Sequence, residues 1–162
     1  MQGEIFSYAL LAALATALLV AAITDIRSRR IDNWLTGGIA AAAPLFWLAA
    51  GMGWVDIGWQ VGLALVTFAV LAGLFAIGQM GGGDVKLLTA LALWIAPMWF
   101  LRLLIVMALL GGALTIAFAL HHRFRNRTAR FAVPYGVAIS AAGLWTIANQ
   151  YGPGALWGSA IG

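Results

Sequence analysis

The sequence contains no cysteine and very few charged residues. The absence of cysteine among its 162 residues excludes disulfides, thiolate catalysis and a cysteine-ligated zinc site. Charged residues make up 9% of the chain, whereas soluble proteins contain about 25%. So few charges cannot cover the surface of a soluble protein of this size, and a soluble domain is therefore excluded.

Apolar residues dominate what remains. They make up 64% of the chain, and the mean hydropathy is +0.98. An all-α integral membrane protein is predicted, because a helix satisfies its own backbone hydrogen bonds inside lipid. We expect one membrane-embedded domain over residues 1–162, and no cleaved signal peptide, since the first apolar run is too long for one and follows an acidic start.

The apolar runs predict a bundle of about six transmembrane helices. The predicted spans cover residues 5–24, 34–50, 57–78, 85–99, 103–120 and 133–150. The first has about 20 residues and would be about 30 Å long, which matches the apolar thickness of a bilayer. Pro44 is expected to kink the second span, Pro97 to interrupt the fourth near its end, and Arg102 to mark the turn into the fifth.

The basic residues predict how the chain crosses the membrane. The net charge of +4 would suit a nucleic-acid partner, but the basic residues lie between apolar runs, so we interpret them as topology signals and expect no nucleic acid. Eight of the nine lie in the first, third and fifth loops: Arg27, Arg29, Arg30, Lys86, Arg123, Arg125, Arg127 and Arg130. These loops are predicted to be cytoplasmic, with both termini on the other side, and to attract anionic lipid head groups at about 1 kcal/mol per residue.

Two aspartates stand at the cytoplasmic ends of predicted spans. Asp25 closes the first span, and Asp84 opens the fourth directly after three glycines, so both lie at the same depth. An ionisable group at a membrane boundary is costly and indicates function. Two carboxylates in a poorly solvated site can share one proton, so that the ionised one activates water and the protonated one polarises a carbonyl. The pair therefore predicts aspartyl protease chemistry, without a metal or another cofactor.

Structural roles for the same acidic residues stay open. Asp84 and Asp32 each stand where the N-cap of a following helix is expected. Asp25 meets the unfavourable end of the helix dipole, and Arg29 is expected to compensate its charge.

The neighbouring glycines and histidines also have two interpretations. Gly81, Gly82 and Gly83 form either a hinge or a surface that an extended substrate backbone approaches, together with Lys86. The Walker spacing of a phosphate-binding loop is absent. The adjacent pair His121-His122 fits a membrane-surface anchor better than a metal site, because neighbouring helical residues point in different directions.

Two other classes of function are alternatives to a protease. In a small transporter or channel subunit the aspartates would form an ion or proton relay. Such relays place their charges near the bilayer midplane, whereas both aspartates here lie at span ends. A purely structural subunit would explain each acid as a cap, but not why both fall at one face beside the glycines.

Three segments resemble the prepilin peptidase family of membrane aspartyl proteases with a Gly-x-Gly-Asp motif. The first, residues 81–88, reads Gly-Gly-Gly-Asp-Val-Lys-Leu-Leu and is similar to the family's second-aspartate motif. The second, residues 25–33, reads Asp-Ile-Arg-Ser-Arg-Arg-Ile-Asp-Asn and resembles its first-aspartate motif. Pro134-Tyr135-Gly136 resembles a weaker element in the last span. A presenilin-like protease shares the second motif, but its tyrosine-aspartate element is not found around Asp25.

The resemblance implies an enzyme that removes the short basic leader of type IV pilin-like precursors at the cytoplasmic face of the bacterial inner membrane. Asp25 and Asp84 would be its catalytic pair. Asp32 stands where the family usually has proline, which adds a third carboxylate near the site. Without cysteines or room for a methyltransferase domain, the chain resembles the short, peptidase-only branch that serves Flp/Tad-type pili.

Overall fold

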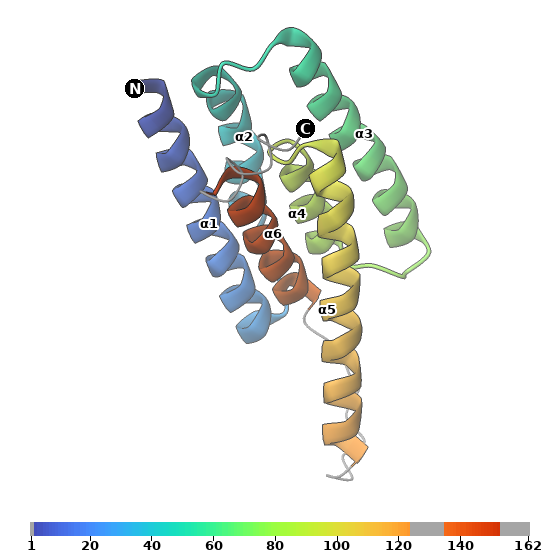
Figure 1. The fold of residues 1–162 in the computed structure, drawn as a ribbon. Helices are drawn as coiled ribbons and strands as arrows, with labels where there is room; N and C mark the ends of the chain where they lie inside the picture. The colour runs from blue at the N-terminus through green and yellow to red at the C-terminus, as the bar shows by residue number, and fades with distance from the viewer. Residues whose placement is uncertain (1, 124–134, 153–162) are drawn as a thin grey trace.

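The described part of the chain folds into six helices. The computed structural model describes residues 2–123 and 135–152, and within these ranges it contains α-helices and no strand (Figure 1). The helices are α1 (Gln2–Ser28), α2 (Asn33–Ala49), α3 (Trp54–Ala76), α4 (Gly82–Ala92), α5 (Pro97–Arg123) and α6 (Tyr135–Tyr151). The prediction of an all-α fold is confirmed.

Most predicted spans correspond to a helix with shifted ends. The predicted spans 5–24 and 57–78 correspond to α1 and α3, and α2 runs through Pro44 without interruption. Helix α1 continues to Ser28, so Asp25 lies within its last turns and not beyond its end.

The fourth predicted span, residues 85–99, is wrong in its extent. Helix α4 has 11 residues, about 16 Å at 1.5 Å per residue, roughly half the apolar thickness of a bilayer. Pro97 does not interrupt it but begins α5, where the missing N–H is not needed. Proline also disfavours a helical residue before it, which separates the two helices at Ala96. Arg102 marks no turn: it lies inside α5 with its guanidinium 4.4 Å from the centre of the Trp99 ring.

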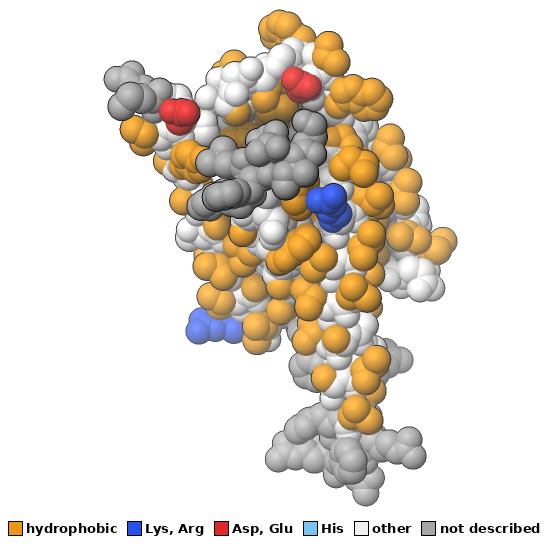
Figure 2. All heavy atoms as spheres, in the orientation of Figure 1, with side chains coloured by type: hydrophobic (Ala, Val, Ile, Leu, Met, Phe, Trp, Pro, Cys, Tyr) orange, Lys and Arg blue, Asp and Glu red, His pale blue; other side chains and the backbone are white. Residues whose placement is uncertain are grey.

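Three segments of the described chain are long and apolar enough to cross a membrane: Gly3–Ser28, Trp54–Ala76 and Pro97–Ala117. Large apolar side chains on these segments, such as Leu65 and Leu109, are exposed. Apolar side chains also cover most of the face seen in Figure 2. An apolar surface of this extent suits contact with lipid.

Helix α4 lies at the centre of the bundle. Its side chains Leu87, Leu88 and Leu91, and Trp94 and Ile95 just after it, are fully or almost fully buried. Helix α3 packs mainly on α4, while α6 packs on α1, α4 and α5 (Figure 1). The helix that carries Asp84 therefore packs against α2, α3 and α6.

Side chains from three other helices bind the backbone carbonyls where α4 ends. The Trp47 indole of α2 donates to Leu93 O at 2.8 Å, and the Tyr151 hydroxyl of α6 donates to Trp94 O at 2.6 Å. With its amide nitrogen turned inward, Gln60 of α3 donates to Ala92 O and Ile95 O at 3.0 Å. Non-helical backbone is tolerated at membrane depth only when protein satisfies it, and these donors allow α4 to be short.

Candidate active site

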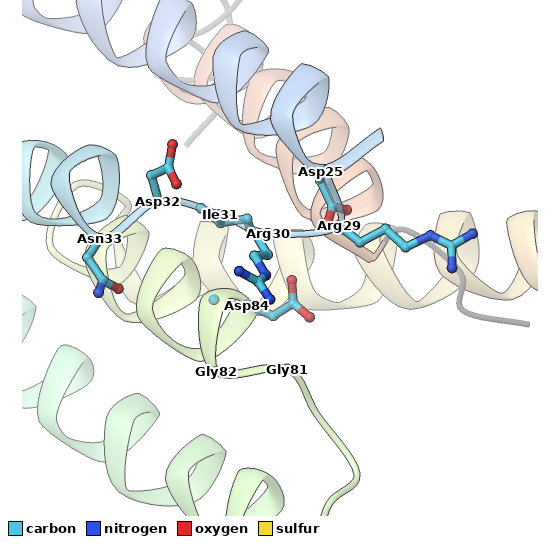
Figure 3. Close-up of a pocket in the computed structure, with 10 residues that line it drawn as sticks. Asp25, Arg29, Arg30, Ile31, Asp32, Asn33, Gly81, Gly82 and Asp84 are labelled. Carbon is cyan, nitrogen blue, oxygen red and sulfur yellow. The ribbon is translucent and has the colours of Figure 1, made fainter. Parts of the chain in front are cut away.

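A cavity of about 400 Å³ opens where α1 ends and where α2 and α4 begin. Its lining contains the residues Asp25, Arg29, Arg30, Ile31, Asp32, Asn33, Gly81, Gly82, Gly83 and Asp84. Figure 3 shows the carboxylates of Asp25 and Asp84 facing this cavity from α1 and α4. The structure thus brings together the two aspartates that the sequence placed at one depth.

Asp25 is held in the last turns of α1. Its side chain is only 6% exposed, and its Oδ2 atom is fully buried with no hydrogen bond of ordinary geometry in the described part of the chain. Arg29 carries a positive charge that interacts favourably with this carboxylate, as the sequence predicted.

Arg29 also ends the helix. Its N–H donates to Asp25 O at 2.9 Å, and its φ of 52° lies in the left-handed region, which is uncommon for a residue with a side chain. This turn directs the chain across the cavity towards Asp32, whose extended backbone precedes α2 (Figure 3).

Asp84 is the third residue of α4, so the predicted N-cap role is wrong. Gly81 is the N-cap, and its backbone amide favours the charge of the Asp84 carboxylate, which stands at the third helical position, where a capping box has its acidic residue. Burial and, to a smaller extent, the nearby charge of Asp25 raise the pKa of Asp84 to about 6, and the backbone amide of Gly81 offsets part of this rise. Asp84 therefore keeps its proton up to about pH 6.

The glycines let the start of α4 pack closely. A Cβ added to Gly83 would lie 3.2 Å from the Ile31 Cβ, and one added to Gly82 would lie 3.3 Å from the Phe75 ring. Both residues are already helical, so only Gly81 is extended. That these glycines contact substrate stays a prediction.

Of two other residues named from the sequence, Asp32 lines the cavity and Lys86 does not. Asp32 lines the cavity and occupies the N-cap position of α2, but its side chain makes no cap hydrogen bond and instead accepts one from the Trp34 indole at 3.3 Å. Lys86 lies outside the cavity lining, and its Nζ donates to Asn33 Oδ1 at 2.8 Å. Lys86 therefore links α4 to α2.

The start of α6 completes the surroundings of Asp25, and sequence reasoning did not place it there. A Cβ added to Gly136 would lie 2.7 Å from Asp25 Oδ2 and 3.0 Å from Ile31 Cδ1. The available signal was the glycine after Tyr135, noted only as part of a resemblance. Pro134 lies outside the described residues, as do Arg125, Arg127 and Arg130, and the side chains of His121, His122 and Arg123 are not described.

The arrangement suits acid–base chemistry on water. Two carboxylates of different surroundings face one cavity, and one of them retains its proton up to about pH 6. A site with one ionised and one protonated carboxyl can remove a proton and supply one in a single step.

Comparison with known proteins gives one match. A family model described as the type IV leader peptidase family matches residues 12–116, which include both Asp25 and Asp84. No curated protein and no solved structure matches the chain.

Proposed function

The chain belongs to the type IV leader peptidase family, and from this we propose that it is a membrane aspartyl endopeptidase that removes the N-terminal leader of prepilin-like precursors. The observation that carries the proposal is the meeting of Asp25 and Asp84 in one cavity, although 58 positions separate them (84 − 25 − 1). The Flp/Tad type of pilin is the proposed substrate class, which rests on the resemblance alone.

The surroundings of the two carboxylates support different roles. Asp84 is the proton donor, since burial and the charge of Asp25 raise its pKa to about 6. Asp25 is the ionised base in this proposal: burial opposes its charge, and the backbone amides of Gly136 and Val137 and the positive charge of Arg29 offset part of that cost. This division gives each aspartate one task at the start of the reaction.

The reaction needs only water and the peptide. Asp25 takes a proton from water while the water oxygen bonds to the scissile carbonyl carbon, and Asp84 gives its proton to the carbonyl oxygen. The resulting gem-diol collapses as one of its hydroxyls returns a proton to Asp84. The C–N bond breaks, and the amine leaves with the proton held on Asp25. The products are a carboxylic acid and an amine, and both carboxyls regain their starting states.

The membrane arrangement is part of the same proposal. The proposed bundle has six helices, of which α4 is too short to cross the bilayer by itself. The distribution of lysine and arginine favours the cavity on the cytoplasmic side of the inner membrane, with both termini opposite. Anionic lipid head groups would contact the basic loops. The leader would enter the cavity beside Gly81, the extended residue of the glycine run, with Gly82, Gly83 and Lys86 nearby.

Co-expression with a candidate pilin precursor tests the proposal by a gel shift for leader removal. Asp25→Asn and Asp84→Asn should each lower cleavage by about 10²–10⁴-fold, the usual contribution of an acid–base group. Asp32→Asn and Asp56→Asn are matched controls and should retain cleavage. Asp56 begins α3 beside Gly53 and does not line the cavity. Normal cleavage by Asp84→Asn protein would refute the aspartate mechanism.

A further inference from the structure

We propose that Gly136 is a positioning residue, because its missing side chain lets the first turn of α6 lie directly on the Asp25 carboxylate and hold both its place and its charge. This inference rests on the proposed function and adds a part of the site that lies outside the family match, which ends at residue 116.

The first step is steric. A Cβ on residue 136 would lie 2.7 Å from Asp25 Oδ2 and 2.8 Å from its Cγ, closer than real Cβ contacts. Asp25 cannot simply turn away, because its side chain is 6% exposed and Ile31 closes the neighbouring space, with its Cδ1 3.0 Å from the same added Cβ. Any side chain at position 136 must therefore displace the carboxylate or separate α6 from α1.

The second step is electrostatic. Asp25 Oδ2 is buried without a hydrogen bond of ordinary geometry, so burial opposes the charge of the carboxylate. The backbone amides of Gly136 and Val137 offset part of that cost. These amides belong to the first turn of α6, where N–H groups have no partner inside the helix and the helix dipole favours an anion.

The other charged groups around Asp25 come from different elements. Arg29 follows α1, Arg30 and Asp32 lie in the connection to α2, and Asp84 comes from α4. Helix α6 carries no charged side chain between Tyr135 and Tyr151, so its contribution to Asp25 is made by the backbone. That contribution depends on a close approach, which glycine permits.

The matched control is Gly143, two turns further along α6. A Cβ there would lie 3.0 Å from Leu18 Cδ1 and 3.5 Å from Leu91 Cδ1, so Gly143→Ala disturbs packing of the same helix on α1 without touching Asp25. Val137→Pro is the second test variant. It removes one of the two amides without adding a Cβ at position 136, at a position in the first helical turn that tolerates proline.

The experiment measures cleavage of a pilin precursor against pH in neutral detergent. Gly136→Ala should lower kcat about 10–100-fold with little change in KM, as a misplaced catalytic group does. The acid limb of its pH profile should also move up by about 0.5–1 pH unit, because the amides no longer stabilise the charge of Asp25. Val137→Pro should move the acid limb in the same direction. Gly143→Ala should lower the melting temperature and leave the pH profile unchanged.

An infrared titration tests the inference without turnover. The carboxyl band of Asp25 is isolated as the difference between Asp84→Asn protein and Asp25→Asn/Asp84→Asn protein. With Gly136→Ala or Val137→Pro added to the Asp84→Asn background, this band should titrate at higher pH. An unchanged titration in both variants would overturn the inference, as would the same change with Gly143→Ala. Failure of the wild-type protein to cleave any precursor would overturn the proposed function, while the infrared result still decides the role of Gly136.

Discussion

At the scale of single residues, the pair of aspartates is made unequal by its neighbours. Asp84 is partly buried at the start of α4, where one backbone N–H compensates only part of the cost of its charge. Asp25 is buried against the start of α6, whose amides face it. Burial opposes the charge of both carboxylates, and backbone amides from different elements offset part of that cost at each one. In the proposed mechanism, these different surroundings let one residue type supply both acid and base.

The raised pKa of Asp84 predicts how stability depends on pH. Its pKa is 3.8 when unfolded and about 6 when folded, so the folded protein binds more protons between these values and loses stability as pH rises through this window. Asp84→Asn removes that loss and should raise the free energy of unfolding by about 1–2 kcal/mol above pH 6, with little effect below pH 4. Thermal melting in detergent at pH 4, 6 and 8 measures this.

Asp56→Asn serves as the control for this prediction, since Asp56 lies at the start of α3 and away from the cavity. It should not reproduce the stabilisation that Asp84→Asn gives above pH 6. A stabilisation by Asp84→Asn that was largest at pH 4 would contradict the assigned pKa.

At the scale of elements, the packing of helix α4 fixes the position of Asp84. The helix is too short to cross a membrane, and it is fixed at both ends. At its start, Gly83 packs on Ile31 and Lys86 binds Asn33. At its end, donors from α2, α3 and α6 bind its carbonyls, and Phe46 stacks on Trp94 with ring centres 5.0 Å apart. The position of Asp84 therefore depends on residues at the opposite end of the bundle.

Removing a donor at the end of α4 should destabilise the fold. Trp47→Phe and Tyr151→Phe keep an aromatic ring but leave Leu93 O and Trp94 O without these partners. Each should lower the free energy of unfolding by about 1–3 kcal/mol, the cost of an unsatisfied buried polar group. Denaturation in detergent measures the loss. Trp54→Phe is the control, because Trp54 is 89% exposed, and a loss as large as that from Trp47→Phe would show that the carbonyl contacts are unimportant.

At the scale of the whole molecule, the cavity lies at one end of the helix bundle. Helix α1 ends at the cavity, where α2, α4 and α6 begin, while α1 begins and α6 ends at the other end of the bundle (Figure 1). The large apolar surface between the two ends suits lipid. The proposed orientation places the cavity end in the cytoplasm, which the basic residues Arg27, Arg29 and Arg30 favour.

The absence of cysteine makes the orientation directly testable. Single cysteines introduced as Ser28→Cys and Gly53→Cys would stand at opposite ends of the bundle on exposed residues. In intact bacterial spheroplasts, an impermeant maleimide should label Gly53→Cys protein at once and Ser28→Cys protein only after permeabilisation. The reverse pattern would invert the proposed topology, and the unsubstituted chain supplies the blank.

The sequence by itself determined the class of the protein and its family, and it predicted that the two aspartates lie at the same end of the helices. The low charge and long apolar runs exclude a soluble fold, and the confirmed family resemblance depends on short motifs around Asp25 and Asp84. Charge content, apolar runs and short motifs are local features, so each can be recognised from residues that are close in the sequence. They also located most helices, because an apolar run of sufficient length forms a helix in lipid wherever it packs.

Only the tertiary structure decided the length of α4, the place of Lys86 and the role of the start of α6. Helix α4 ends early because Trp47, Gln60 and Tyr151, each distant in sequence, supply the hydrogen bonds that further helix would have made. Gly136 lies against Asp25 because α6 packs on α1, an approach that no local pattern encodes. Contacts between distant segments depend on how the whole chain folds, and these contacts set the surroundings of the two carboxylates.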